Sequence, residues 1–129
     1  MVFIRPEQFA ALDAAARQTF LDRLSNDLAT AFPAAAVRLQ PARLRQVIAA
    51  AIERAAGYGI TWESALADFA GLALQVGSDF DRHPAVRRVL EDAAIPPNLR
   101  VRALVQALSP AEWRQVRRAS SDSHLPVRP

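Results

Sequence analysis

Apolar residues recur every three or four positions along most of this chain, the spacing of a helix with one buried face. The first such stripe predicts a helix from Pro6 to Phe32. Its apolar positions are Phe9, Leu12, Ala16, Phe20, Leu24 and Leu28. Phe32 precedes Pro33, and the residue before a proline is disfavoured in helical angles, so we expect the helix to end there. A second stripe predicts a helix from Pro41 to about Ala56.

Two glycines, Gly57 and Gly59, mark the end of that second helix. Glycine adopts the left-handed conformation of a helix C-cap without steric cost. Thr61 then offers a side-chain oxygen to the free amides of a third helix, and the interior Gly71 indicates the close approach of a neighbouring helix. The apolar face of this third helix is formed by Trp62, Leu66, Phe69, Ala73 and Val76.

The segment that follows, G-S-D-F-D-R-H-P, supports two interpretations. Asp79 and Asp81 lie two residues apart and could present two carboxylates to a hard cation such as Mg²⁺. The alternative is a turn, which we favour because no further oxygen ligands accompany the pair. In such a turn the Asp side chains bond to nearby backbone amides, Phe80 points into the core and Pro84 opens the next helix.

The rest of the chain predicts three shorter helices. The first runs from about Pro84 to Asp92, and the second follows Pro97. Ser109 and Glu112 in the sequence S-P-A-E form a capping box that opens the last helix, with proline at its first position. No periodicity follows this helix.

With 129 residues, 51% of them hydrophobic, the chain is long enough for a single core. We expect an all-α fold, a compact bundle of about five to six helices over residues 1–119, with a flexible, disordered C-terminal tail over residues 120–129. The absence of cysteine excludes disulfides and thiolate metal sites. No apolar run is long enough to cross a bilayer, and M-V-F-I-R-P lacks the core of a signal peptide. We therefore predict a cytoplasmic protein without a membrane partner.

Every basic residue is an arginine, and the formal net charge at pH 7 is only +3, so the sequence pI of 10.9 overstates how basic the chain is. The net charge is −1 for residues 1–32, +3 for 33–60, −3 for 61–95 and +4 for 96–129. This distribution predicts polarised faces. A stripe of Arg114, Arg117 and Arg118 could meet phosphates. No base-stacking pattern accompanies it, so we do not expect nucleic acid as the partner.

No catalytic constellation is visible in the sequence. His83 adjoins a proline at a helix start, where capping is common, and His124 lies in the predicted tail. Neither has a nucleophile and an orienting group in view, and there is no glycine-rich phosphate loop. We predict a protein that is not an enzyme and that has no catalytic, cofactor-binding or metal-binding residues.

Aromatic residues are the better guide to a binding surface, because Trp and Tyr anchor many protein interfaces. Ile60 and Leu74 fall off the main apolar face and would form an exposed patch beside Trp62. From exposure and charge we select a set of candidate partner-binding residues. They are Tyr58, Trp62, Asp68, Asp79, Asp81, Arg82, Trp113, Arg114 and Arg117.

The stretch G-Y-G-I-T-W-E-S-A-L-A-D-F, followed by G-S-D-F-D and a proline, resembles small all-helical accessory proteins encoded beside type VI secretion spike and effector genes in proteobacteria. The resemblance covers roughly residues 5–108 and does not extend to the last helix or the tail. It implies a non-enzymatic adaptor or co-chaperone that helps to stabilise an effector or to load it onto the spike. Its partner would be the secreted effector, a second chaperone or the spike protein.

Two other hypotheses remain open. An immunity protein would bind and neutralise a cognate toxin, and an acidic surface around Asp68, Asp79 and Asp81 would suit a basic nuclease. A small enzyme could use the turn that holds Asp79 and Asp81, together with a cation.

Overall fold

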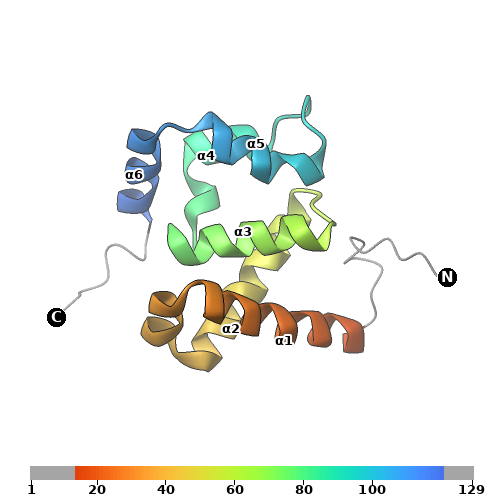
Figure 1. Ribbon diagram of the computed structural model, residues 1–129. Coiled ribbons are helices and arrows are strands. Elements are labelled where there is room, and N and C mark those ends of the chain that lie inside the picture. Colours follow the sequence, from red (N-terminus) through yellow and green to blue (C-terminus); the bar gives the residue numbers. More distant parts are fainter. Residues whose placement is uncertain (1–13, 121–129) are drawn as a thin grey trace.

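The computed structural model describes residues 14–120, which fold into six α-helices and two short 3-10 helices, with no strand in that range (Figure 1). The α-helices are α1 (Ala14–Ala31), α2 (Pro33–Gly57), α3 (Glu63–Gln75), α4 (Pro84–Leu90), α5 (Arg100–Ala107) and α6 (Pro110–Ala119). The 3-10 helices are η2 (Phe80–Arg82) and η3 (Pro97–Leu99). The predicted all-α class is confirmed. Residues 6–13 of the first predicted helix and residues 121–129 of the predicted tail lie outside the described residues.

Helix α2 begins at Pro33 rather than at Pro41, and a kink at Gln40 divides it. Gln40 has a positive φ of 67°, so the helical path is interrupted just before Pro41. Pro33 supplies a preorganised first position, and the alanines at 34–36 favour a helix without adding to a visible apolar stripe. The predicted start at Pro41 is therefore confirmed for the helical segment after the kink, whereas the segment before it, residues 33–39, was missed because alanine-rich segments carry little periodic signal.

The core lies where α2 and α3 cross, with α1 on one side of α3 and α4 and α5 on the other (Figure 1). Phe69 of α3 packs against Phe80 of η2, with ring centroids 5.0 Å apart. Both rings are buried, as predicted for Phe80. Ile60 and Leu74, which we expected to be exposed, are buried too. Because α3 is packed on more than one side, a single stripe underestimates its contact surface.

The turn after α2 is a glycine C-cap, as predicted, with Gly59 as the left-handed residue at a φ of 89°. The amides of Gly59 and Ile60 donate to the carbonyl oxygens of Ala56 and Ala55, at 2.9 and 3.1 Å. This pair of hydrogen bonds is the Schellman motif, and Ile60 enters the core directly after it.

Asn98 of η3 binds the two residues that precede α3. Its Oδ1 accepts from the backbone amides of Thr61 and Trp62, at 2.8 and 2.9 Å, and its Nδ2 donates to Thr61 Oγ1 at 3.1 Å. The predicted Thr61 cap was therefore wrong. Thr61 is instead bound by a side chain far away in the sequence, which no local pattern could indicate.

Arg100 joins α5 to the C-terminal ends of α2 and α4. Its Nη1 donates to the carbonyl oxygens of Tyr58 and Leu90, at 3.2 and 3.0 Å, and its Nε donates to that of Ile95 at 2.8 Å. A guanidinium group is electrostatically favourable at helix C-termini. Asn98 and Arg100 together fix α5 over the turn between α2 and α3.

The predicted starts of α4 and α6 are confirmed. Pro84 opens α4, and His83 Nδ1 accepts from the Ala85 amide at 3.2 Å, so this histidine is a helix cap. Ser109 and Glu112 form the complete capping box of α6.

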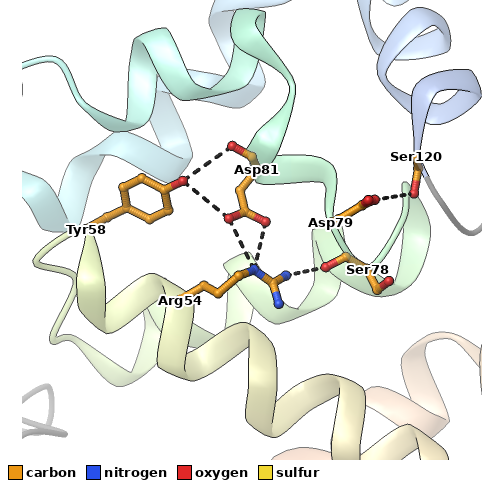
Figure 2. A network of polar contacts seen from close by, with 6 residues as sticks. All are labelled: Arg54, Tyr58, Ser78, Asp79, Asp81 and Ser120. Carbon is orange, nitrogen blue, oxygen red and sulfur yellow. Dashed lines mark hydrogen bonds and ion pairs between the residues drawn. The ribbon is translucent and has the colours of Figure 1, made fainter.

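Ser120, which we expected to begin the tail, is buried at the end of α6. Its Oγ donates to Asp79 Oδ1 at 2.8 Å (Figure 2). A Cβ atom on Gly77 would overlap both Oγ and Cβ of Ser120. Gly77 therefore provides the space that lets the end of α6 dock on the loop after α3.

Gly77→Ala should lower the free energy of unfolding by about 1–3 kcal/mol, because the added methyl group must displace Ser120. Chemical denaturation measures this loss. Gly57→Ala is the matched control, since a Cβ atom there meets nothing within 4 Å. It should be neutral, or stabilising by up to about 1 kcal/mol. Ser120→Gly should recover part of the loss in the Gly77→Ala protein, and strictly additive effects would contradict the contact.

Candidate functional site: an apolar groove along α3

A hollow of about 430 Å³ follows the exposed side of α3, between the end of α1 and α5. Its apolar lining consists of Leu28, Phe32, Ala67, Gly71, Leu72, Val101 and Val105. Gly71 belongs to this lining, and a Cβ atom there would make ordinary van der Waals contact with the ring of Phe32, 3.4 Å away. The close approach of a neighbouring helix that Gly71 predicted was therefore wrong, because the nearest atoms belong to the Phe32 ring at an ordinary contact distance.

A second hollow of about 370 Å³ continues from the first toward α6. The two hollows share Leu72, Gln75 and Val105, and the second adds Val76, Trp113, Arg114 and Arg117. We call the two hollows together, with the residues that line them, the α3 groove. It follows α3 from the level of Phe32 to that of Trp113, on a helix that lies at the centre of the molecule (Figure 1).

Val105 lies where the two hollows meet and is 53% exposed. Leu72, Val76 and Trp113 around it are only partly buried. A concave apolar surface with a few polar groups at its edge is the usual form of a binding site. The α3 groove is therefore the candidate functional site.

Four charged side chains border the α3 groove, namely Asp68, Arg102, Arg114 and Arg117. Partial burial raises the pKa of Asp68, while the positive charge of Arg102 acts in the opposite direction and to a smaller extent. Within residues 14–120, Arg114 and Arg117 have no ion-pair partner. The groove is thus apolar along its floor and positively charged at its α6 end.

A separate polar cluster lies where the end of α2 meets η2 (Figure 2). Asp81 is only 2% exposed, and Arg54 Nε donates to both of its carboxylate oxygens, at 2.9 and 3.2 Å. The Tyr58 hydroxyl donates to Asp81 Oδ2 at 3.3 Å, and Arg54 Nη2 donates to the carbonyl oxygen of Ser78. Asp79 points the other way, toward Ser120 (Figure 2).

The two aspartates therefore make different contacts and do not converge on one point. Among residues 14–120, no group of three or more His, Asp or Glu side chains is placed to hold a metal ion. Phe80 and Pro84 occupy the places that the turn interpretation predicted, but Asp81 binds the side chains of Arg54 in α2 and of Tyr58 just after it, and not a nearby amide. The acidic surface expected around Asp68, Asp79 and Asp81 is not formed, because Asp81 is buried.

The structure brings some of the predicted partner-binding residues together and separates others. Asp68, Trp113, Arg114 and Arg117 all line the α3 groove. Tyr58, Asp81 and Arg82 line a different, open hollow of about 440 Å³ beside Arg54 and Arg87. Asp79 accepts a hydrogen bond from Ser120. Trp62 is 40% exposed and lines neither the α3 groove nor this open hollow.

Sequence reasoning missed Phe32, Leu72, Arg102 and Val105, which form much of the α3 groove. Val105 carried no signal of its exposure, because it lies four residues after the buried Val101 and so has the spacing of the buried stripe. Phe32 carried none, because its position depends on the turn between α1 and α2.

Comparison of the chain with models of protein families, with curated proteins and with solved structures found no match. No described helix is both long enough and apolar enough to span a membrane.

Arg54→Met should lower the free energy of unfolding by about 3 kcal/mol, because it leaves a buried carboxylate without its cation. Asp81→Asn should cost less, since the Arg54 side chain is 25% exposed and its charge stays partly hydrated. The exposed pair of Arg45 and Asp22 is the control, and Asp22→Asn should cost less than about 1 kcal/mol. Chemical denaturation measures all three. Equally small losses at both pairs would show that the buried pair has no special role.

The folded protein should lose stability above pH 10 because of Tyr58. Burial first, then the charge of Asp81 and the hydrogen bond to it, raise the pKa of Tyr58 above its ordinary value of 10.0. The folded chain holds the hydroxyl proton more tightly than the unfolded chain. The contribution of Tyr58 is therefore complete below pH 10 and is lost as the pH rises from 10 through the raised pKa.

Tyr58 is the only tyrosine, and the chain has no lysine or cysteine, so the ultraviolet absorbance of tyrosinate reports this group alone. Its titration midpoint should be higher in the folded protein than in denaturant. Tyr58→Phe should flatten the alkaline loss of stability, which denaturation at several pH values measures. Identical midpoints in the two states would overturn the prediction.

Proposed function

We propose that this chain is a non-enzymatic protein-binding accessory, an adaptor or co-chaperone that helps to stabilise a type VI secretion effector or to load it onto the spike. The α3 groove is the observation that carries the proposal. It presents an apolar floor with Val105 exposed at its centre, the kind of surface that a segment of another protein covers. The resemblance of residues 57–84 supports the choice of the secretion system and of a cytoplasmic site of action.

Covering the α3 groove would contribute favourable binding free energy. Each Å² of apolar surface removed from water contributes about 25 cal/mol, before the cost of ordering both partners is subtracted. Leu72, Val76 and Trp113 adjoin Val105, so a partner that covers all four side chains buries one contiguous patch. An effector that awaits loading needs its apolar segments covered, because exposed apolar patches promote aggregation.

The walls of the groove are held in place before any partner arrives. Asn98 Oδ1 accepts two hydrogen bonds from the turn before α3. Arg100 donates three, to the carbonyl oxygens of Tyr58 after α2, of Leu90 at the end of α4 and of Ile95 in the loop before η3, and these contacts together fix α5. Ser120 fixes the end of α6 through Asp79. A preformed site loses less free energy to ordering on binding, which favours a role in recognition.

An immunity protein that binds and neutralises a cognate toxin is the second candidate, since the same groove would serve it. The positively charged α6 end favours an acidic surface on the toxin rather than the basic nuclease considered from the sequence. Deletion of the gene separates the two functions. Loss of an adaptor lowers the amount of effector on the secreted spike, whereas loss of an immunity protein leaves the cell poisoned by its own toxin.

A tagged form of the chain, purified from its native organism, should retain components of the type VI secretion system, identified by mass spectrometry. Val105→Asp should lose them, because a carboxylate at the centre of the groove opposes burial against an apolar partner. Val37→Asp is the matched control. Val37 is 72% exposed on α2, outside the α3 groove, so this variant should retain the same components.

Denaturation curves establish that both variants fold before the purifications are compared. A partner list without secretion components would refute the proposed system. Equal retention by the Val105 and Val37 variants would remove the α3 groove as the binding surface.

A further inference from the structure

The α3 groove has a length, a shape and a charge pattern that restrict its occupant. We propose that it binds an amphipathic helix of the partner protein, with the apolar face of that helix on α3 and its acidic side chains toward α6. This inference rests on the proposed function and specifies the chemistry of the partner.

The length of the groove fits a short helix. Its floor runs along α3 from Ala67 to Val76, which is about 14 Å at 1.5 Å per residue. A bound helix of about ten residues covers that distance. A segment that binds as a strand needs an exposed sheet edge to pair with, and residues 14–120 contain no strand. An amphipathic helix needs only an apolar groove, which is what α3 and its neighbours form.

The apolar positions on the floor have helical spacing. Leu72 and Val76 are four residues apart, which is about 6 Å along α3, and Ala67 and Gly71 form a second pair with the same spacing nearer to Phe32. Val105 and Trp113 line the second hollow together with Leu72 and Val76. A partner helix with apolar residues at i, i+3 or i+4, and i+7 would place these side chains in a row along the floor of the groove.

The charges at the border decide which kind of amphipathic helix fits. Arg114 and Arg117 lie three residues apart on α6, so their guanidinium groups lie on the same side of that helix. Neither has an ion-pair partner within the described part of the chain. Guanidinium groups bind carboxylates through paired hydrogen bonds, which favours Asp or Glu on the partner at this end. Arg102 and Asp68 offset each other farther along the groove.

The test uses synthetic helical peptides of about 15 residues as probes, a length at which an isolated helix can form. One peptide carries leucines at the spacing given above and glutamates on its flank. A second has lysine in place of each glutamate, and a third has serine in place of each leucine. Trp113 fluorescence reports binding in the full-length chain that carries Trp62→Phe, which leaves a single tryptophan.

The glutamate peptide should bind at least about ten-fold more tightly than the lysine peptide, and the serine peptide should not bind. Arg114→Glu combined with Arg117→Glu should reverse the preference between the first two peptides. Arg88→Glu, an exposed arginine of α4 outside the groove, should leave the preference unchanged. Val105→Asp should abolish binding of both. Equal affinities for the glutamate and lysine peptides, or binding that survives Val105→Asp, would overturn the inference.

Other occupants would give different results, each of which also overturns the inference. Self-association that ultracentrifugation detects and that Val105→Asp abolishes would identify a second copy of the chain. Peptide binding that appears only after deletion of residues 1–13 would identify that segment. If no peptide binds but the secretion components still depend on Val105, the helix inference fails and the proposed function stands. If neither the peptides nor those components bind, the proposed function fails as well.

Discussion

The placement of the C-terminal half of the chain depends on one buried carboxylate, that of Asp81. Arg54 in the last turns of α2 and Tyr58 just after it both bind this group, so η2 is held against the end of α2. A carboxylate in a protein interior costs several kcal/mol if it has no partner. The three side chains must therefore come together when this part of the core forms. We interpret the cluster as a device that selects one arrangement of η2 on α2, since a buried ion pair contributes little net stability.

Polar contacts made by later parts of the chain position α5 and α6, which form the walls of the α3 groove. Arg100 binds carbonyl oxygens at the ends of α2 and α4, and thereby positions α5. Ser120 reaches Asp79 across the gap that Gly77 leaves open, and thereby positions α6. Because α5 has only eight residues, it flanks α3 without covering it. The groove is the space that remains between helices whose positions are set elsewhere.

The helical period predicted most of the fold and only part of the candidate site. The capping box at Ser109, the proline at the start of α4 and the burial of Phe80 were all correct, because each depends on residues next to one another in the chain. Thr61 was assigned as the cap of α3, but it makes its hydrogen bonds with Asn98 instead. In the groove, Trp113 and Arg114 were selected from their residue types, whereas Phe32 and Val105 were not. Which apolar residues stay exposed depends on how many neighbours each helix acquires.

The amino-acid sequence by itself determined that this protein is helical, where most of its helices begin and end, and that its positive charge is carried by arginine alone. These properties follow from propensity, periodicity and capping, which act over a few neighbouring residues. Only the tertiary structure decided that Asp81 is buried against Arg54, while Asp79 accepts a hydrogen bond from Ser120. It also decided that one side of α3 stays open between α5 and the ring of Phe32. Those outcomes depend on contacts between residues far apart in the chain, and such contacts are settled by packing rather than by local pattern.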